Sequence, residues 1–347
     1  MLGYRWGRDS EVTKTLDPEN ILLQAKDLNV YFTLKKGGFG RTPVVVRAVD
    51  GLSFTVRRGS TYGIVGESGC GKSTTAMAVM RLAPLTSGSI EFEGIELSGL
   101  RGAGLRNFRR NLQIIFQDPY SSLDPRRRAG NIVREPLDRM GIGSKKEREE
   151  WISELFHRVG LRPEQAQLFP HQFSGGQRQR IGIARALSSR PKLIVCDEPV
   201  SALDVAIQAQ ILNLLMELQK DFGLTYLFIS HDLGVVKYMC DDISVMYLGR
   251  IMEEADRIAL FARPQHPYTK ALLSAVPTID SIKHGVKTRI KLEGDPPSPI
   301  SPPSGCVFHT RCSFTVSRCR RDMPQLKNYQ TGHRVACHLV DENGFRD

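Results

Sequence analysis

The sequence lacks any apolar run that approaches the roughly 18 residues needed to cross a membrane as a helix. Residues 1–20 are polar and of mixed charge, without the apolar stretch of a secretory signal, and we expect them to form a poorly ordered leader. The first absence excludes a membrane-spanning helix, and the second argues against secretion. We therefore expect a cytosolic protein that reaches a membrane only through a partner.

The basic clusters lack the interleaved aromatic residues that a nucleic-acid track would need. The net charge is +11, and basic residues gather at 101–110, 126–128 and 318–321. Such a balance suits nucleotides, nucleic acid or an anionic membrane surface. Each cluster taken singly is more simply explained as a solvated face. At 347 residues, with 41% hydrophobic and 24% charged residues, the chain has the size and composition of two or three soluble domains.

The segment from Gly66 to Ser73 has the pattern G-x-x-x-x-G-K-S of a phosphate-binding loop. It follows a predicted buried strand and precedes a predicted helix at 73–82, which is the context that such a loop needs. Glycines let the backbone approach a ligand closely, and successive N–H groups form a nest for anionic oxygens. We expect Lys72 to reach the terminal phosphates of a nucleotide and Ser73 to ligate Mg²⁺. The alternative is a glycine-rich turn with an incidental lysine.

Polar side chains follow three predicted buried strands. Asp197 and Glu198 come directly after four apolar residues, and Gln117 and His231 each follow another apolar segment. Ligands of an open parallel sheet bind beyond the carboxyl ends of its strands. We therefore expect Asp197 to hold Mg²⁺, Glu198 to polarise a water molecule, and Gln117 to reach a metal or water. Alone, each residue has a structural explanation, so the prediction depends on all of them together.

Residues 127–190 mix charged and apolar residues at helical spacing, which predicts a small helical insertion. Near its end, Ser174-Gly175-Gly176-Gln177 precedes a predicted helix at 181–187. This second glycine-rich turn offers another anion site at a helix N-terminus.

The first predicted strand carries two adjacent aromatics, Tyr31 and Phe32, and either could stack on an adenine ring or be a core or edge aromatic. A helix with apolar residues on one face is predicted between Asp204 and Gly223. Strands are predicted at 21–33, 44–56 with a break at Asp50-Gly51, 61–65, 90–97, 112–116, 193–197, 225–230 and 243–248.

In this order the motifs resemble the nucleotide-binding subunits of ABC transporters, over roughly residues 21–260. The resemblance implies an α/β fold: a P-loop ABC ATPase cassette at 21–262 with a RecA-like core sheet, an antiparallel β-subdomain, and a helical subdomain at about 127–190. By this resemblance Gly66–Ser73 is the Walker A loop, Gln117 the Q-loop residue, Ser174–Gln177 the signature, Leu193–Asp197 the Walker B strand, Ser201–Asp204 the D-loop and His231 the switch histidine.

The resemblance implies that ATP is hydrolysed between two cassettes arranged head to tail, with the Walker A loop of one facing the signature of the other. The implied catalytic residues are Lys72, Gln117, Glu198 and His231. The implied ATP contacts are Tyr31, Phe32, Gly66, Glu67, Ser68, Gly69, Cys70, Gly71, Lys72, Ser73, Thr74, Gln117, Ser174, Gly175, Gly176, Gln177, Asp197 and Asp204, with Mg²⁺ on Ser73, Gln117 and Asp197.

The closer resemblance is to the ATPases of oligopeptide and dipeptide importers, carried by Gln117–Arg126, His171–Phe173, His266–Thr269 and Gly294–Pro299. It implies ATP hydrolysis that drives import of peptides or a related small solute. The implied partners are a paired ATPase subunit in a heterodimer, two transmembrane permease subunits and an extracytoplasmic solute-binding protein. The implied location is the cytoplasmic face of the inner (plasma) membrane.

Residues 263–347 are expected to form a C-terminal extension with four cysteines, behind a stiff proline-rich linker at 296–303. The cytosol disfavours disulfides, and a small segment with little apolar core usually needs a metal or disulfide staple. The spacing contains no C-x2-C pair of a zinc finger, and some peptide-importer ATPases that this chain resembles carry an iron–sulfur cluster. We expect a [4Fe–4S] cluster, with zinc or plain thiols as alternatives, on Cys306, Cys312, Cys319 and Cys337.

The alternative function is that of an ABC-type ATPase acting on nucleic acid or ribosomes. Chromosome and repair ATPases of this class insert long coiled coils between the two nucleotide motifs, and translation factors carry two cassettes in one chain. This sequence has one set of motifs and no long heptad run. We therefore expect no nucleic-acid partner.

Overall fold

The structure is a computed structural model that describes residues 20–34, 43–276 and 290–346. The predicted leader therefore lies, but for its last residue, outside the described residues. The central element is a sheet in the order β11-β12-β10-β9-β3-β8-β7-β6. Its strands are β3 (Thr61–Val65), β6 (Leu112–Ile115), β7 (Leu193–Asp197), β8 (Thr225–Ser230), β9 (Asp242–Tyr247), β10 (Arg250–Asp256), β11 (Lys327–Gln330) and β12 (His333–Val335).

The nucleotide motifs sit on the parallel part of this sheet. Strands β6, β7, β8, β3 and β9 run parallel to one another, whereas β10, β11 and β12 are joined to this part and to each other by antiparallel pairing. All residues of β3, β7 and β8 are buried, as expected for strands covered on both faces. Their carboxyl ends therefore lie together at one edge of the sheet.

A second sheet is antiparallel throughout, in the order β2-β1-β4-β5. Its strands are β1 (Ile21–Leu34), β2 (Val44–Arg57), β4 (Ser87–Phe92) and β5 (Ile95–Glu96). The predicted break at Asp50-Gly51 is wrong, because β2 continues through this point. The Gly51 N–H donates to Asn29 Oδ1 at 2.8 Å, and the register shifts here, so a bulge absorbs the glycine without ending the strand.

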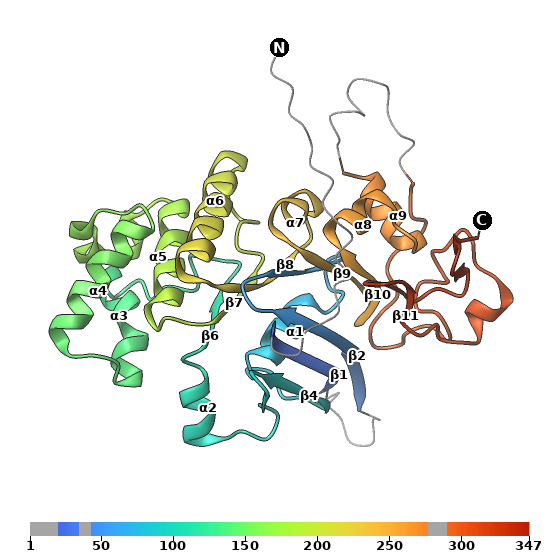
Figure 1. The fold of residues 1–347 in the computed structure, drawn as a ribbon, viewed down its shortest axis with the longest axis horizontal. Helices are drawn as coiled ribbons and strands as arrows, with labels where there is room; N and C mark the ends of the chain where they lie inside the picture. Colours follow the sequence, from blue (N-terminus) through green and yellow to red (C-terminus); the bar gives the residue numbers. More distant parts are fainter. Residues whose placement is uncertain (1–19, 35–42, 277–289, 347) are drawn as a thin grey trace, which may run out of the picture.

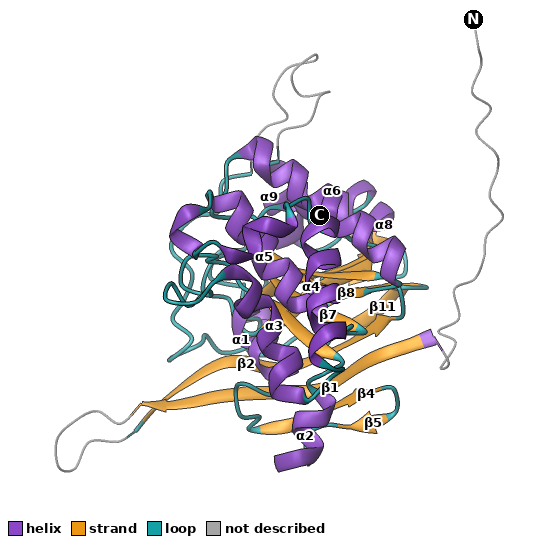
Figure 2. Cartoon of the chain, turned by 90° about the vertical axis from the view of Figure 1, so that its left-hand side faces the viewer, coloured by secondary structure: helices purple, strands orange, loops and turns teal. Residues whose placement is uncertain are grey.

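Helix α1 (Lys72–Val79) lies between the two sheets, and α6 (Val205–Phe222) and α7 (Leu233–Met239) cover the opposite face of the central sheet (Figure 1). In the side view, the antiparallel sheet lies in the lower part of the molecule and most of the helices lie above it (Figure 2). One apolar core fills the space around α1, and a second lies under the covering helices. Shorter helices are α2 (Gly102–Phe108), α8 (Arg257–Ala262) and α9 (Pro267–Ser274).

The helical subdomain contains α3 (Ala129–Met140), α4 (Lys145–Arg158) and α5 (Gly175–Ser188). Helix α5 begins at Gly175, earlier than the predicted helix at 181–187. The reason is a capping box, in which Ser174 Oγ accepts from the Gln177 N–H and Gln177 Oε1 accepts from the Ser174 N–H. The predicted core sheet, antiparallel subdomain and helical subdomain are confirmed.

The C-terminal residues pack onto the cassette. Strands β11 and β12 extend the central sheet by pairing β12 with β10. Val307 and Phe308 are buried in the same core as β7 and β8, and the Phe308 ring meets the Tyr247 ring at 5.3 Å. The segment is therefore stabilised by the core of the cassette, which the expectation of a separate segment in need of its own staple did not include. A final hairpin pairs β13 (Val340–Asp341) with β14 (Gly344–Phe345). In the described ranges we find no helix that is both long and apolar enough to cross a membrane.

Candidate functional site

The loop between β3 and α1 wraps closely around its own backbone. A Cβ on Gly66 would lie 2.2 Å from Met246 O, and one on Gly71 would lie 2.1 Å from Ala48 O. Gly71 also has a φ of +108°, which L side chains rarely adopt. These two glycines are therefore required by the path of the chain. The loop delivers Lys72 to the start of α1, where Nζ donates to Gly66 O at 2.9 Å and Glu67 O at 3.0 Å.

Glu198 is the centre of the polar cluster at the end of β7. Its Oε2 accepts from Gln117 Nε2 at 3.0 Å and lies 3.0 Å from His231 Nδ1. Its Oε1 lies 4.0 Å from Lys72 Nζ. Gln117, His231 and Lys72 come from three segments that are far apart in the sequence, and all three lie beside this one carboxylate. Glu198 also has a φ of +49°, and such strained backbone is typical of functional sites.

Asp197 is buried at the carboxyl end of β7, and its Oδ1 accepts from Ser73 Oγ at 3.0 Å. Burial raises its pKa, and the neighbouring Glu198 charge raises it further, whereas Ser73 and Lys72 lower it. A buried carboxylate beside a hydroxyl is a hard oxygen donor set that suits Mg²⁺. Ser73 and Asp197 therefore fit the predicted metal, while the Gln117 amide donates to Glu198.

A cavity of about 580 Å³ opens over the phosphate loop. Its lining brings together the loop and the strand-end cluster with apolar residues of β2, α7 and α9, and with one proline of the C-terminal segment. The lining residues are Val46, Ala48, Gly66, Glu67, Ser68, Gly69, Gly71, Lys72, Ser73, Thr74, Gln117, Glu198, His231, Leu233, Leu272 and Pro299. The cavity thus combines an anion-binding loop with the cationic side chain of Lys72 and the acidic side chain of Glu198.

The two predicted stacking aromatics differ in their surroundings. Phe32 is 39% exposed and pairs with Val46, which lines the cavity. Tyr31 is held elsewhere, since its hydroxyl donates to Asp50 Oδ1 at 2.5 Å. Neither aromatic is among the described residues that line the cavity. Phe32 is nevertheless the better placed of the two to reach a base.

Cys70, Asp204 and the signature residues 174–177 are also absent from the lining within the described residues. Cys70 is buried under the loop, where burial raises its pKa to about 11. Ser174 and Asp204 are exposed, and they lie at neighbouring helix starts, since a Cβ on Gly175 would be 3.6 Å from Leu203 Cδ2. The signature and D-loop residues thus form a separate surface on this chain.

Sequence reasoning missed the contribution of residues beyond the cassette. The Glu67 N–H donates to the Tyr268 hydroxyl at 3.0 Å, and Arg311 Nη1 donates to Glu67 Oε2 at 2.8 Å. Pro299 O accepts from the Arg47 N–H at 3.2 Å and brings the proline-rich segment to the cavity. No local sequence pattern announces these contacts, because each joins segments far apart in the chain.

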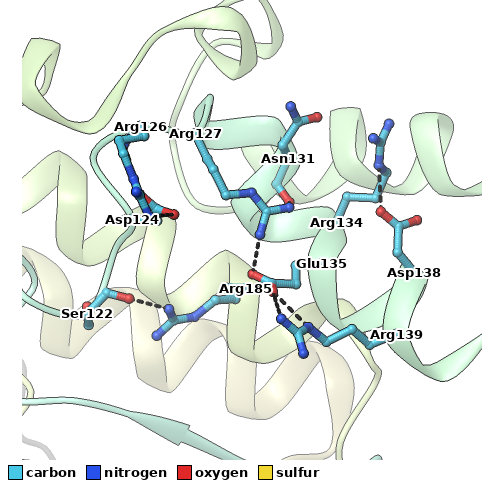
Figure 3. A network of polar contacts seen from close by, with 10 residues as sticks. All are labelled: Ser122, Asp124, Arg126, Arg127, Asn131, Arg134, Glu135, Asp138, Arg139 and Arg185. Atoms are coloured by element: carbon cyan, nitrogen blue, oxygen red, sulfur yellow. Dashed lines mark hydrogen bonds and ion pairs between the residues drawn. The ribbon is translucent and has the colours of Figure 1, made fainter.

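The segment after Gln117 is tied to the signature helix. Arg185 of α5 donates to Ser122 O at 2.5 Å, and the Arg178 guanidinium lies 3.9 Å from the centre of the Tyr120 ring. An ion pair between Arg127 and Glu135, at 2.7 Å, links the next residues to α3 (Figure 3). Two arginines of the signature helix therefore hold the loop that leaves the nucleotide cavity, while its Tyr120 side chain stays 63% exposed.

The C-terminal segment carries four free thiols, and those of Cys306 and Cys319 are buried. Burial is the main cause that raises the pKa of Cys337 to about 12, and charges on Cys306, Cys312 and Cys319 raise it further. The Leu339 N–H donates to Cys337 Sγ at 3.5 Å. However, no three Cys, His, Asp or Glu side chains in the described residues have an arrangement that could hold a metal ion. The predicted iron–sulfur or zinc site therefore has no support from this geometry.

Two protein families match parts of the chain. "ABC transporter" matches residues 49–201, and "Oligopeptide/dipeptide transporter, C-terminal region" matches residues 252–319. The second match begins in β10 and ends at Cys319, so it covers the segment that contacts the phosphate loop.

Similar proteins have related descriptions. The chain is 51% identical over 318 residues to the probable peptide ABC transporter ATP-binding protein y4tS of Sinorhizobium fredii, covering 92% of this chain and 90% of that protein. It is 50% identical over 322 residues to the oligopeptide transport ATP-binding protein AppF of Bacillus subtilis, covering 92% and 98%. A dimeric structure of the ATP-binding cassette MJ0796 in a post-hydrolysis state, bound to ADP and Pi, aligns with a TM-score of 0.60 and 29% identity, covering 68% of this chain and 99% of that chain.

Proposed function

This chain belongs to the ATP-binding proteins of oligopeptide and dipeptide ABC transporters, and on this basis we propose that it hydrolyses ATP to drive the import of peptides or a related small solute. The observation that carries the proposal is the meeting of Glu198 with the phosphate loop in one cavity. The two relatives named above are both described as peptide-transport proteins, which does not favour the alternative function on nucleic acid or ribosomes.

The reaction that this geometry supports is transfer of the terminal phosphoryl group to water. The loop N–H groups and Lys72 bind the phosphates, and Glu198, oriented by Gln117 and His231, positions the water and accepts its proton. When bound at Ser73 and Asp197, Mg²⁺ supplies the positive charge that offsets the charge of the phosphates. The protein contributes position and electrostatics rather than a covalent intermediate.

The catalytic unit that we propose is a head-to-tail dimer with a paired ATPase subunit. Ser174 and Asp204 are exposed, and the signature and D-loop residues do not line the cavity of their own chain among the described residues, so they can complete the cavity of a partner. Val205, at the start of α6 beside this surface, is 81% exposed although it is apolar, which suits an interface. The similar cassette MJ0796 is a dimer.

We propose that a permease docks beside the loop that follows Gln117. Exposed Tyr120 and Ser121 form a mixed apolar and polar surface that the sheet core does not need. Arg178 and Arg185 connect this surface to the signature helix, so a movement of the permease can reach the nucleotide interface. Two permease subunits, a solute-binding protein and a location on the cytoplasmic face of the inner membrane complete the proposal.

Purified protein reconstituted in vesicles with its paired ATPase and permeases should hydrolyse ATP faster when peptide and binding protein are present. A photocrosslinking residue at Ser121 should link to a permease, whereas the same residue at exposed Ser87 on the antiparallel sheet should not. Stimulation by DNA or ribosomes instead of permeases would overturn the proposed function. Crosslinks to the permease from the C-terminal segment alone would instead place the docking site on that segment.

The C-terminal cysteines are proposed to hold a [4Fe–4S] cluster, with zinc as the alternative. The support is the presence of four cysteines within one short segment of the sequence, Cys306, Cys312, Cys319 and Cys337. The raised thiol pKa of Cys306, about 11, means that a free thiol would stay protonated at neutral pH, and a metal would have to displace the proton.

Anaerobically purified protein should be brown and contain iron and acid-labile sulfide. Cys312→Ser should lose the colour, and Cys240→Ser, which removes a buried cysteine of the cassette, should keep it. The iron content, sulfide content and visible absorbance are measured for both variants. Colourless protein with tightly bound zinc would refute the cluster and support the zinc site. Free alkylation of all four thiols in folded protein would refute a metal of either kind.

A further inference from the structure

The C-terminal segment contacts the phosphate loop through a partly buried ion pair. Arg311 Nη1 lies 2.8 Å from Glu67 Oε2, and the Arg311 side chain is only 8% exposed. Glu67 is the second residue of the loop and lines the nucleotide cavity. A tail residue thus reaches the element that binds the phosphates.

Aromatic packing fixes Arg311 in this position. Its guanidinium lies 5.9 Å from the centre of the Tyr247 ring. The Phe308 ring, from the same segment, lies 5.3 Å from both the Tyr247 and Tyr268 rings. Tyr268 in turn accepts a hydrogen bond from the Glu67 N–H. Both the backbone and the carboxylate of Glu67 are therefore held by residues outside the nucleotide motifs.

Glu67 poses an electrostatic problem for a cavity that binds phosphates. Glu67 lines the same cavity as Lys72, and the negative charge of its carboxylate repels an anionic ligand bound there. Arg311 supplies the opposite charge at hydrogen-bond distance. The Glu67 carbonyl also accepts from Lys72 Nζ at 3.0 Å, so a shift of Glu67 would displace the acceptor of this cation.

We propose that Arg311 is a positioning residue for ATP binding, which neutralises Glu67 and holds the phosphate loop in its binding geometry. It acts through Glu67 and is not itself a lining residue among those described. The C-terminal segment therefore sets the nucleotide affinity of the cassette. This inference rests on the proposed function, because it concerns the same cavity.

The test measures binding of a fluorescent ATP analogue with Mg²⁺ to the full chain. Arg311→Met should raise the Kd about tenfold, within the roughly 5- to 150-fold range typical of coupling between sites. This loss of affinity should be smaller at high salt, because it comes from the uncompensated charge of Glu67. Arg311→Lys should recover part of the affinity. The control Arg318→Met removes an exposed arginine that pairs with Asp322 in the same segment, and should leave the Kd unchanged.

The decisive variant combines Arg311→Met with Glu67→Gln. Removing the carboxylate should rescue the loss, so that the double variant binds within about twofold of Glu67→Gln alone. A role confined to tail stability would lower the unfolding temperature without this rescue. Parent-like affinity in Arg311→Met, or a double variant no better than Arg311→Met, would overturn the inference. Absence of ATP binding by the parent would instead refute the proposed function. If Arg311→Met fails to fold, Arg311→Gln and its combination with Glu67→Gln provide the same comparison, because glutamine also removes the positive charge.

Discussion

Glu198→Gln should nearly abolish ATP hydrolysis while ATP binding stays close to that of the parent. The amide preserves the size of the side chain but cannot accept the proton of the attacking water. General base catalysis typically contributes about 10²- to 10⁴-fold, and we expect a loss of turnover of this size. Phosphate release by the assembled transporter measures turnover, and titration with a fluorescent ATP analogue measures binding. The ATP-bound closed dimer should accumulate.

Glu217→Gln is the matched control, because it makes the same substitution on the exposed face of α6. It should leave both turnover and binding unchanged. Near-parental turnover in Glu198→Gln would remove Glu198 from the proposed mechanism. Loss of ATP binding together with turnover would instead assign it a role in holding the loop, since its Oε1 lies 4.0 Å from Lys72 Nζ.

The strand-end cluster could be predicted because two local rules place it. Buried parallel strands appear in the sequence as short apolar runs, and their carboxyl ends share one edge of the sheet. The sequence pattern alone therefore predicted that Glu198, Gln117 and His231 lie at one edge of the sheet. The phosphate loop could also be predicted, because the path of its backbone leaves no room for a side chain at Gly66 or Gly71.

The C-terminal contacts could not be predicted, because they depend on pairing between distant segments. The Arg311–Glu67 contact joins residues 244 positions apart. In the sequence the tail suggested a small segment that needs its own staple. In the structure Phe308 fills the cassette core and β12 extends the central sheet, so the tail draws its stability from the cassette.

Local signals were misleading where a side chain altered the backbone pattern. Asp50-Gly51 predicts a turn, yet the Asn29 side chain accepts from the Gly51 N–H and the strand continues. Gly175 and Gly176 predict a turn before a helix, yet the capping box at Ser174 includes both in the first turn of α5. In both cases the deciding hydrogen bond is made by a polar side chain, which periodicity in hydrophobicity does not report.

Ser174→Arg should leave ATP binding to this chain nearly intact and should strongly reduce hydrolysis by the assembled pair. Ser174 is exposed and lies outside the cavity of its own chain among the described residues. In the proposed dimer it faces the phosphates bound by the partner, where a long cationic side chain would displace the signature N–H groups. Loss of a preorganised donor typically costs about 10²- to 10³-fold in turnover, and we expect a decrease near the lower value.

The substitution also removes a helix cap, which costs about 1 kcal/mol and needs its own control. Ser144→Arg supplies it, because Ser144 caps α4 of the same subdomain through the same capping box, with Glu147 in place of Gln177. The two variants should lose similar stability in thermal unfolding, but only Ser174→Arg should lose hydrolysis. Equal activity of the two variants, or full hydrolysis by the partner ATPase in the absence of this chain, would contradict a shared site. A selective loss in Ser174→Arg would place the signature of one subunit at the phosphates of the other.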